Sequence, residues 1–412
     1  MNIIDKTNKP EILAPAGDLE KLKVALMYGA DAVYAGVPEF GMRVKEIGFD
    51  LNSLKEGIQY AHDLGKKVYV TVNIFAKNHD IELLPDFLHE LEKINPDALI
   101  VADPGIMGVI YDEKIKTPLH ISTQANIINW RAVSWWVEKM NFERVILARE
   151  LHWMEIKEIH EHCPNIDLEI FVHGAMCMSY SGRCNISNYL TNRDANQGDC
   201  SHCCRWNYKV YVEEQTRPGE LMLVDEDERG SYFFNSKDLC LIGMLDELLQ
   251  TGAMSWKIEG RNKSIYYLAQ VIGQYRAALD DYWESPEKYK ENIGNYLNEL
   301  EAATSRGYTT GFFGNDGSKM VNIDVRKQEK DKQFVGLVLG KENGLVKVEA
   351  RNQIRIGDKL DIYTTNGAKE ISIDGFLYEN GEKMADVVNT NTIFYVSDSD
   401  WPAYAMIRKI VN

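Results

Sequence analysis

The sequence has no long hydrophobic run: no uninterrupted apolar segment approaches the length of a membrane-spanning helix. Its first residues, Met1 to Lys6, also lack the charged and then apolar profile of a secretion signal. Basic residues are outnumbered, 46 against 62 acidic, and the net charge of −16 excludes a surface evenly coated with positive charge for nucleic acid. We therefore expect a globular, cytoplasmic protein that does not enter a membrane.

Signatures of common hydrolases and dehydrogenases are missing as well. No H-E-x-x-H zinc motif occurs, and no activated nucleophile is written beside a base, so proteolysis is not indicated. The turn Pro15–Asp18 precedes a predicted helix that Asp18 would cap, but it lacks the glycine-rich length of a dinucleotide-binding loop.

Cysteine is scarce, seven residues in 412, yet most of it is clustered. Cys177, Cys184, Cys200 and Cys204 follow an apolar strand with the spacing C-x6-C-x15-C-x3-C. Soft thiolates select iron–sulfur clusters or zinc, and a first gap of six residues is longer than structural zinc pairs usually show. We expect an iron–sulfur cluster, with 4Fe–4S as the favoured form; zinc and unligated thiols are the alternatives.

Positive charge is concentrated locally on this acidic chain. Residues 173–210 carry four basic residues against two acidic, and residues 250–276 carry four against one. A locally positive surface at the opening of the barrel, on an otherwise acidic protein, would attract an anionic substrate to that place. A solvated basic face is the alternative explanation.

From residue 11 onward, short apolar runs alternate with segments of helical periodicity, which is typical of a parallel sheet. Eight such units over about 270 residues predict a TIM-type (β/α)8 barrel, with a doubly wound open sheet as the alternative. The predicted strands are Ile12–Ala14, Ala32–Ala35, Val68–Val72, Ala98–Ala102, Leu119–Ser122, Arg144–Ala148, Leu168–Val172 and Trp256–Ile258.

A cysteine-rich insertion, residues 173–235, separates the seventh strand from its helix. Because active sites of such barrels are built at the carboxyl ends of the strands, we expect the insertion over the barrel mouth. From residue 332, short alternating strands with hairpin signals predict a small antiparallel β-barrel, suited to substrate presentation or dimerisation. We therefore divide the chain into a catalytic barrel domain, 1–325, and a C-terminal domain, 332–412.

Polar residues recur where the predicted strands end, and in a parallel barrel they would converge on one cavity. Each one alone is more often a loop cap than a catalyst, but their repetition at six strand ends favours a site. They are Asn73, Asp103, Gln124, Arg149, Glu150, His173, Glu259 and Arg261.

The cysteine block also resembles a known signature. The pattern Glu169-x-Phe171-x-x-Gly174-Ala-Met-Cys177-x4-Gly-x-Cys184 is similar to that of the collagenase-like peptidase family U32, and most closely to its tRNA hydroxylation proteins. Supporting segments span nearly the whole chain: 13–17, 32–36, 189–196, 235–239 and 257–261. The resemblance implies a cluster held by the four cysteines and an oxygen-independent, prephenate-dependent hydroxylation of the wobble uridine to 5-hydroxyuridine in the tRNA anticodon loop.

One position departs from the family pattern. Cys203 stands where relatives have a proline before the last ligand, so Cys203 and His202 compete with Cys204 for the fourth ligand position. We favour Cys204 because Arg205-Trp206 follows it as in relatives.

The implied chemistry assigns roles to the remaining candidates. Forked guanidinium groups and a lysine suit a small dicarboxylate co-substrate such as prephenate; these are Arg43, Arg149, Arg261 and Lys257. Asn73 and Gln124 would read the base edge, and His173, Glu150 and Glu259 would move protons. Tyr180, Tyr189 and Trp206 are candidate stacking platforms, with packing around the cluster as the alternative.

Other functions stay open at this level. They are a collagenase-like peptidase, a hydroxylase of rRNA or of a quinone precursor, and a cluster-bearing assembly subunit without catalysis of its own. A homo- or hetero-oligomer is compatible with the sequence.

Overall fold

The structure is a computed structural model. It describes residues 9–38, 40–41, 48–177, 179–180, 183–206, 210–213, 221–224, 237–301, 307–314, 332–397 and 400–411.

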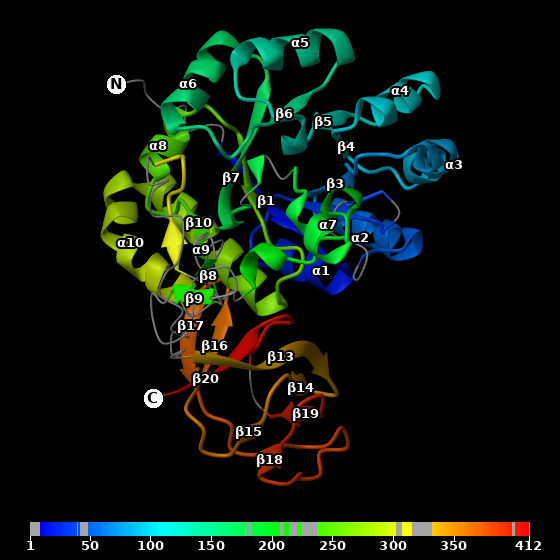
Figure 1. Cartoon of the computed structure of the whole chain (residues 1–412). Coiled ribbons are helices and arrows are strands. Elements are labelled where there is room, and N and C mark those ends of the chain that lie inside the picture. Colours follow the sequence, from blue (N-terminus) through cyan, green and yellow to red (C-terminus); the bar gives the residue numbers. More distant parts are fainter. Residues whose placement is uncertain are drawn as a thin grey trace.

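The eight predicted strands form a closed parallel barrel, so the predicted TIM-type fold is confirmed (Figure 1). Each strand pairs with the next, and the last one pairs with both the seventh and the first, which closes the sheet. The strands are β1 (Glu11–Pro15), β2 (Ala32–Gly36), β3 (Lys67–Val72), β4 (Ala98–Val101), β5 (Leu119–Ile121), β6 (Arg144–Ile146), β7 (Asp167–Ala175) and β11 (Ser255–Ile258).

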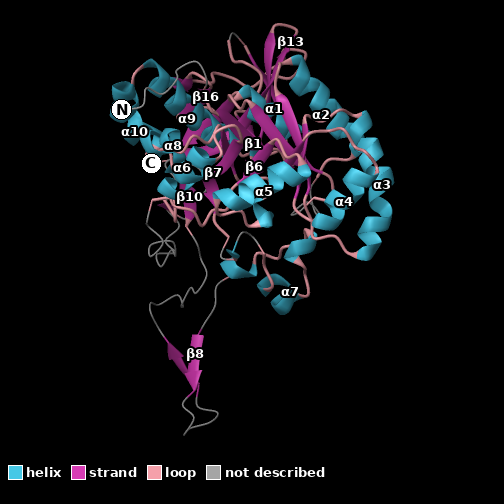
Figure 2. Ribbon diagram, turned by 90° about the horizontal axis from the view of Figure 1, so that it is seen from above, coloured by secondary structure: helices cyan, strands magenta, loops and turns pink. Residues whose placement is uncertain are grey.

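Amphipathic helices surround the strands (Figure 2). Their buried faces pack on the outer side of the barrel and form one large apolar core with it. Asp18 caps the first helix as predicted, accepting a hydrogen bond of 2.9 Å from the backbone nitrogen of Lys21. The helices are α1 (Leu19–Met27), α2 (Leu51–Asp63), α3 (Asn78–Lys93), α4 (Pro104–Asp112), α5 (Trp130–Met140), α6 (Trp153–His162), α8 (Leu245–Gln250), α9 (Ile265–Glu284) and α10 (Pro286–Glu301).

The cysteine-rich insertion leaves the barrel at the end of β7. It contains α7 (Ile186–Thr191), the short 3-10 turns η3 (Ala195–Gln197) and η4 (Cys203–Arg205), and the antiparallel pair β8 (Val210–Glu213) and β9 (Leu221–Val224). The chain then returns as β10 (Asp238–Cys240), which pairs antiparallel with β7 and parallel with β12 (Tyr308–Thr309). The excursion therefore begins and ends beside the same barrel strand.

The C-terminal strands are antiparallel, as predicted. Six of them form one sheet in the order β17-β16-β20-β13-β14-β19, and β15 pairs with β18. Their bounds are β13 (Lys332–Glu342), β14 (Leu345–Ala350), β15 (Ile354–Arg355), β16 (Leu360–Thr364), β17 (Gly367–Ile371), β18 (Val387–Val388), β19 (Ile393–Val396) and β20 (Met406–Ile410).

Specific contacts join this sheet to the barrel domain. Tyr28 of α1 stacks on Tyr363 at 5.7 Å between ring centroids, and its hydroxyl donates to the Tyr363 carbonyl at 3.0 Å. The fully buried Arg408 donates to Asp361 at 2.6 and 2.7 Å and to Glu299 of α10 at 2.8 Å. Among the helices in the described ranges, none is long and apolar enough to cross a membrane.

Candidate functional site

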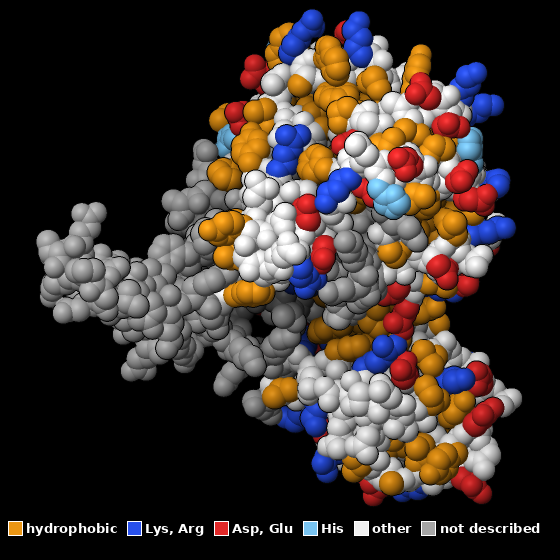
Figure 3. Space-filling view, turned by 45° about the vertical axis from the view of Figure 1, so that its right-hand side comes forward, with side chains coloured by type: hydrophobic (Ala, Val, Ile, Leu, Met, Phe, Trp, Pro, Cys, Tyr) orange, Lys and Arg blue, Asp and Glu red, His pale blue; other side chains and the backbone are white. Residues whose placement is uncertain are grey.

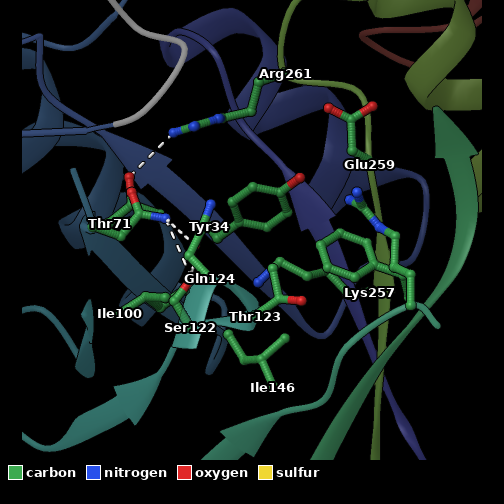
Figure 4. A pocket seen from close by; sticks show the side chains of 13 residues that line it. Tyr34, Thr71, Ile100, Ser122, Thr123, Gln124, Ile146, Lys257, Glu259 and Arg261 are labelled. Atoms are coloured by element: carbon green, nitrogen blue, oxygen red, sulfur yellow. Dashed lines mark hydrogen bonds between the residues drawn. The ribbon is translucent and has the colours of Figure 1, made fainter. Parts of the chain in front are cut away.

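A pocket lies at the carboxyl ends of the barrel strands, where active sites of this fold are found (Figure 4). Its enclosed part measures about 60 Å³, room for several water molecules. We call it the barrel pocket and define it by its lining: Tyr34, Thr71, Asn73, Ile100, Ser122, Thr123, Gln124, Ile146, Arg149, Phe171, Lys257, Glu259 and Arg261.

One side of the barrel pocket is a network of amides and hydroxyls. The Asn73 side chain, just after β3, donates to Gln124 Oε1 at 3.2 Å and to Ser122 Oγ at 3.4 Å. Ser122 Oγ is also hydrogen-bonded to Gln124 Oε1. Because these bonds cross from the end of β3 to the end of β5, they fix the position of both amide groups.

Three cations also line the barrel pocket, each close to an aromatic ring. The Arg149 guanidinium lies 3.7 Å from the Phe171 ring centroid, and Arg261 donates to Thr71 Oγ1 at 3.1 Å. Lys257 Nζ lies 4.3 Å from the ring centroid of Tyr34. Three cations around one small cavity make it a site for anionic groups.

Two glycines of the sequence motifs allow this arrangement. A Cβ atom at Gly174, whose φ is +106°, would lie 2.4 Å from the carbonyl oxygen of Glu259. A Cβ atom at Gly17 would lie 2.4 Å from the carbonyl oxygen of Arg261. Only glycine fits at such close approaches, so both residues help to place the loop that follows β11.

A buried ionic network lies beneath the barrel pocket, and sequence reasoning missed it. Glu169, which is 0% exposed, accepts hydrogen bonds from Lys257 Nζ at 2.5 Å, Arg144 at 3.3 Å and Ser255 at 3.4 Å. Arg144 continues the network to Glu11 at 2.7 Å. One feature of the sequence could have indicated this network: Glu169 is a charged residue within an otherwise apolar strand, and such a charge is rarely buried unless it is paired.

Burial lowers the pKa of Lys257, and the neighbouring Glu169 carboxylate opposes that shift. The pKa of Arg144 is raised, because its nearby carboxylates outweigh the effect of burial. Of the two cations in this network, Lys257 therefore gives up its proton more easily than Arg144 does.

Six of the predicted site residues come together in the barrel pocket: Asn73, Gln124, Arg149, Lys257, Glu259 and Arg261. Glu150 follows Arg149 but is not among the described lining residues. Asp103 serves as the N-cap of α4, accepting from Gly105 and Ile106. Arg43 lies outside the described residues.

His173 is placed away from the barrel pocket. The pairing of β7 with β11 shifts by one residue, from Lys257 opposite Phe171 to Ile258 opposite His173. Such a bulge reverses the alternation of side chains, so His173 faces the helix layer instead of the barrel interior. It is 1% exposed, with the rings of Tyr275 and Tyr308 at 5.6 and 5.4 Å, and burial lowers its pKa to about 3.

Hydrogen bonds tie the cysteine-rich insertion to the pocket rim. Arg183 donates to the Gln124 carbonyl from Nε at 3.1 Å and from Nη2 at 3.0 Å, and its guanidinium lies 5.4 Å from the Phe75 ring centroid. The Phe75 backbone nitrogen donates to the Asn196 carbonyl at 3.1 Å. The part of the insertion that carries Arg183 and Asn196 therefore lies over the ends of β3 and β5, where the sequence predicted the insertion to lie.

Within the insertion, short polar contacts hold the cysteine-bearing segments together. Asn196 accepts from the Cys184 backbone nitrogen at 3.1 Å and donates to its carbonyl at 2.9 Å. Ser187 and Ser201 are hydrogen-bonded through their hydroxyls at 2.9 Å, next to Cys200. Cys184 is buried, and Cys177, Cys200 and Cys204 are half-buried.

The cysteines fit a cluster in kind and in position along the chain. Among the described residues, no three His, Cys, Asp or Glu side chains are arranged to hold a single metal ion. Thiolates are the donor type that both an iron–sulfur cluster and a zinc ion take.

The visible face in the space-filling view carries acidic and basic side chains interspersed, with scattered apolar groups (Figure 3). This agrees with the prediction that positive charge is not spread over the whole surface. Fold and site together define a (β/α)8-barrel protein with a cationic pocket at its strand ends and a cysteine-rich insertion over that pocket.

Residues 17–322 match the family described as Peptidase family U32, and residues 330–408 match its C-terminal domain. The tRNA hydroxylation protein P of Haemophilus influenzae strain ATCC 51907 is 38% identical over 452 residues, covering 98% of this chain and 97% of that protein. The protein of the same name from Escherichia coli strain K12 is 39% identical over 416 residues, 91% of each chain. A 23S rRNA 5-hydroxycytidine synthase of the same strain is 34% identical over 274 residues, 66% of this chain and 40% of that protein. The chain belongs to peptidase family U32.

Proposed function

We propose that this protein hydroxylates the wobble uridine of tRNA to 5-hydroxyuridine in the cytoplasm. Prephenate would be its co-substrate and an iron–sulfur cluster its cofactor. The names of the two relatives that align over nearly the whole chain support hydroxylation of tRNA. The observation that carries the proposal is the contact of Arg183 with Gln124, which joins the cysteine-rich insertion to the rim of a cationic pocket.

The pocket chemistry suits a splayed nucleotide. A uracil edge presents two carbonyl oxygens and one N–H group, and the Asn73 and Gln124 amides can pair with such groups. Exposed aromatic side chains in the insertion support stacking of neighbouring bases: Tyr180 is 51% exposed, Tyr189 89% and Trp206 49%. An anticodon loop offers such unpaired bases without the cost of opening a helix.

The cations suit the co-substrate. Arg149 and Arg261 line the pocket as forked donors for the two carboxylates of prephenate, and Lys257 adds a point charge. Glu259 lines the same pocket and is our candidate for moving a proton. Cys177, Cys184, Cys200 and Cys204 would hold the cluster, which supplies one-electron transfer when bound.

A second candidate is hydroxylation of rRNA, favoured by the likeness to the 23S rRNA 5-hydroxycytidine synthase. We rank it lower because the aligned part covers 40% of that protein. The site does not favour a peptidase of the cysteine–histidine or serine–histidine type, because none of the described residues lining the barrel pocket is a histidine or a cysteine.

The test is nucleoside analysis of tRNA and rRNA from a strain that lacks the gene and any second route to 5-hydroxyuridine. We expect loss of 5-hydroxyuridine derivatives from tRNA and their return with the wild-type gene. Complementation with Arg261→Gln should fail, while Lys341→Gln, in an exposed ion pair of the C-terminal domain, should succeed. Unchanged tRNA with loss of 5-hydroxycytidine from rRNA would select the second candidate.

A further inference from the structure

The amine of Lys257 occupies an unusual position on the floor of the barrel pocket. Its side chain lies among Tyr34, Thr123 and Ile146 (Figure 4), and the residue is only 4% exposed. Nζ lies 4.3 Å from the Tyr34 ring centroid and 5.6 Å from that of Phe171. The amine thus lies beside two aromatic rings on a residue that lines the barrel pocket.

Glu169 is placed to take a proton from this amine. Its carboxylate is 2.5 Å from Nζ and also accepts from Arg144 at 3.3 Å and Ser255 at 3.4 Å. These other donors keep the carboxylate stabilised when the lysine is neutral. Burial lowers the pKa of Lys257 against the opposing effect of Glu169, which makes the neutral amine more accessible than that of an exposed lysine.

The cations nearby define what such an amine could meet. The Arg261 guanidinium lies 5.7 Å from the same Tyr34 ring that Lys257 contacts. The Arg149 guanidinium lies 3.7 Å from the Phe171 ring centroid, which is 5.6 Å from Lys257 Nζ. A carboxylate held by one of these guanidinium groups would bring an adjacent carbonyl carbon toward Nζ. That combination, a carboxylate next to a ketone, is a 2-oxo acid.

We propose that Lys257 binds 2-oxo acids covalently, as an imine between Nζ and the carbonyl carbon. Glu169 accepts a proton from the ammonium group, and the neutral amine adds to the carbonyl to give a carbinolamine. Glu169 then returns its proton to the leaving hydroxyl, water departs, and a protonated imine remains beside the Glu169 carboxylate. No electrons are gained or lost in the sequence.

This inference deepens the proposed function and rests on it for the natural ligand, because prephenate is itself a 2-oxo acid. It gives the co-substrate a covalent anchor in the barrel pocket, in addition to its ionic contacts. The covalent step itself needs neither RNA nor the cluster, so it can be tested separately.

The test is reductive trapping on the full-length protein purified without air. The protein is incubated with pyruvate and sodium cyanoborohydride, and its intact mass and peptide masses are measured. We expect a saturable gain of one reductively attached 2-oxo acid per chain, mapped to Lys257. Lactate, which has the same size but no ketone, should give no adduct.

Two variants sharpen the result. Lys257→Arg keeps a cation beside Glu169 but cannot form an imine, so the adduct should fall at least tenfold. The matched control is Lys332→Arg, an ion-paired lysine outside the pocket, whose Nζ lies 2.6 Å from Glu299; it should trap like the wild type.

Absence of an adduct, or an adduct spread over surface lysines, would overturn the inference. Peptide mapping of the wild type decides this even if Lys257→Arg does not fold. Hydroxylation of tRNA without trapping would remove the imine and leave the proposed function standing. Trapping on Lys257 without any RNA hydroxylation would support the imine and contradict the proposed function.

Discussion

Replacing Glu169 with glutamine should strongly destabilise the barrel domain. Glu169 has no contact with solvent, and it is the carboxylate bonded to Lys257, whose side chain is only 5% exposed. Arg144 keeps its bonds to Glu11 and Asp167, both at 2.7 Å, so the main loss falls on the lysine. Breaking a buried pair on one side costs about 3–5 kcal/mol, which corresponds to a decrease of roughly 10 °C in Tm for a domain of this size.

The loss should depend on pH in a defined direction. Without Glu169, the pKa of Lys257 falls further in the folded protein, while the unfolded chain keeps the usual value of about 10.4. Between these values the unfolded chain binds more protons, so the stability of Glu169→Gln rises with pH. The variant should therefore recover part of its deficit between pH 7 and pH 9.

Thermal and urea unfolding at the two pH values measure both effects. The double variant Glu169→Gln with Lys257→Met removes the unpaired charge and should be more stable than Glu169→Gln alone. A deficit below about 1 kcal/mol at pH 7, or no recovery in the double variant, would refute the view that this pair is desolvated and coupled.

Three further predictions follow from other parts of the chain. Lowering the pH from 7 to 5 should cost His173→Phe less stability than the wild type. Burial lowers the pKa of His173 to about 3 in the folded protein, so the unfolded wild-type chain binds the proton first and the wild type loses up to about 1.4 kcal/mol of stability per pH unit. Equal losses in urea unfolding would contradict the buried neutral imidazole. Arg408→Met removes both short hydrogen bonds to the buried Asp361 and leaves it the longer ion pair with Lys332 at 3.9 Å. The substitution should cost up to about 3–5 kcal/mol and speed proteolysis of the C-terminal domain; an unchanged cleavage rate would argue against it. Cys204→Ala should abolish the iron chromophore in the absorption spectrum, while Cys203→Ala should retain it. The reverse result would make Cys203, and not Cys204, the fourth ligand.

Much of the fold could be predicted because each barrel strand is an apolar run bounded by turn residues. The carboxyl ends of parallel strands meet at one end of a barrel, which is why Asn73, Gln124 and Arg261, far apart in sequence, could be assigned to one pocket. The same topology placed the insertion after β7 over the mouth. These inferences need only strand order and direction, which the sequence pattern contains.

Details that depend on three-dimensional pairing could not be predicted. The bulge in β7 was not predicted, and it turns His173 away from the pocket that its position at a strand end had suggested. The partnership of Glu169 with Lys257 and Arg144 joins three strands, so no local pattern reveals it. Charged residues within apolar strands were visible, but their partners were not.

A reaction in vitro tests directly whether this protein hydroxylates tRNA. Protein purified without air and loaded with iron and sulfide is incubated with unmodified tRNA and prephenate, and the nucleosides are analysed by mass spectrometry. We expect 5-hydroxyuridine at the wobble position, formed only with prephenate present and lost in Arg261→Gln. Cluster-loaded, folded protein that leaves the uridine unchanged would contradict this expectation.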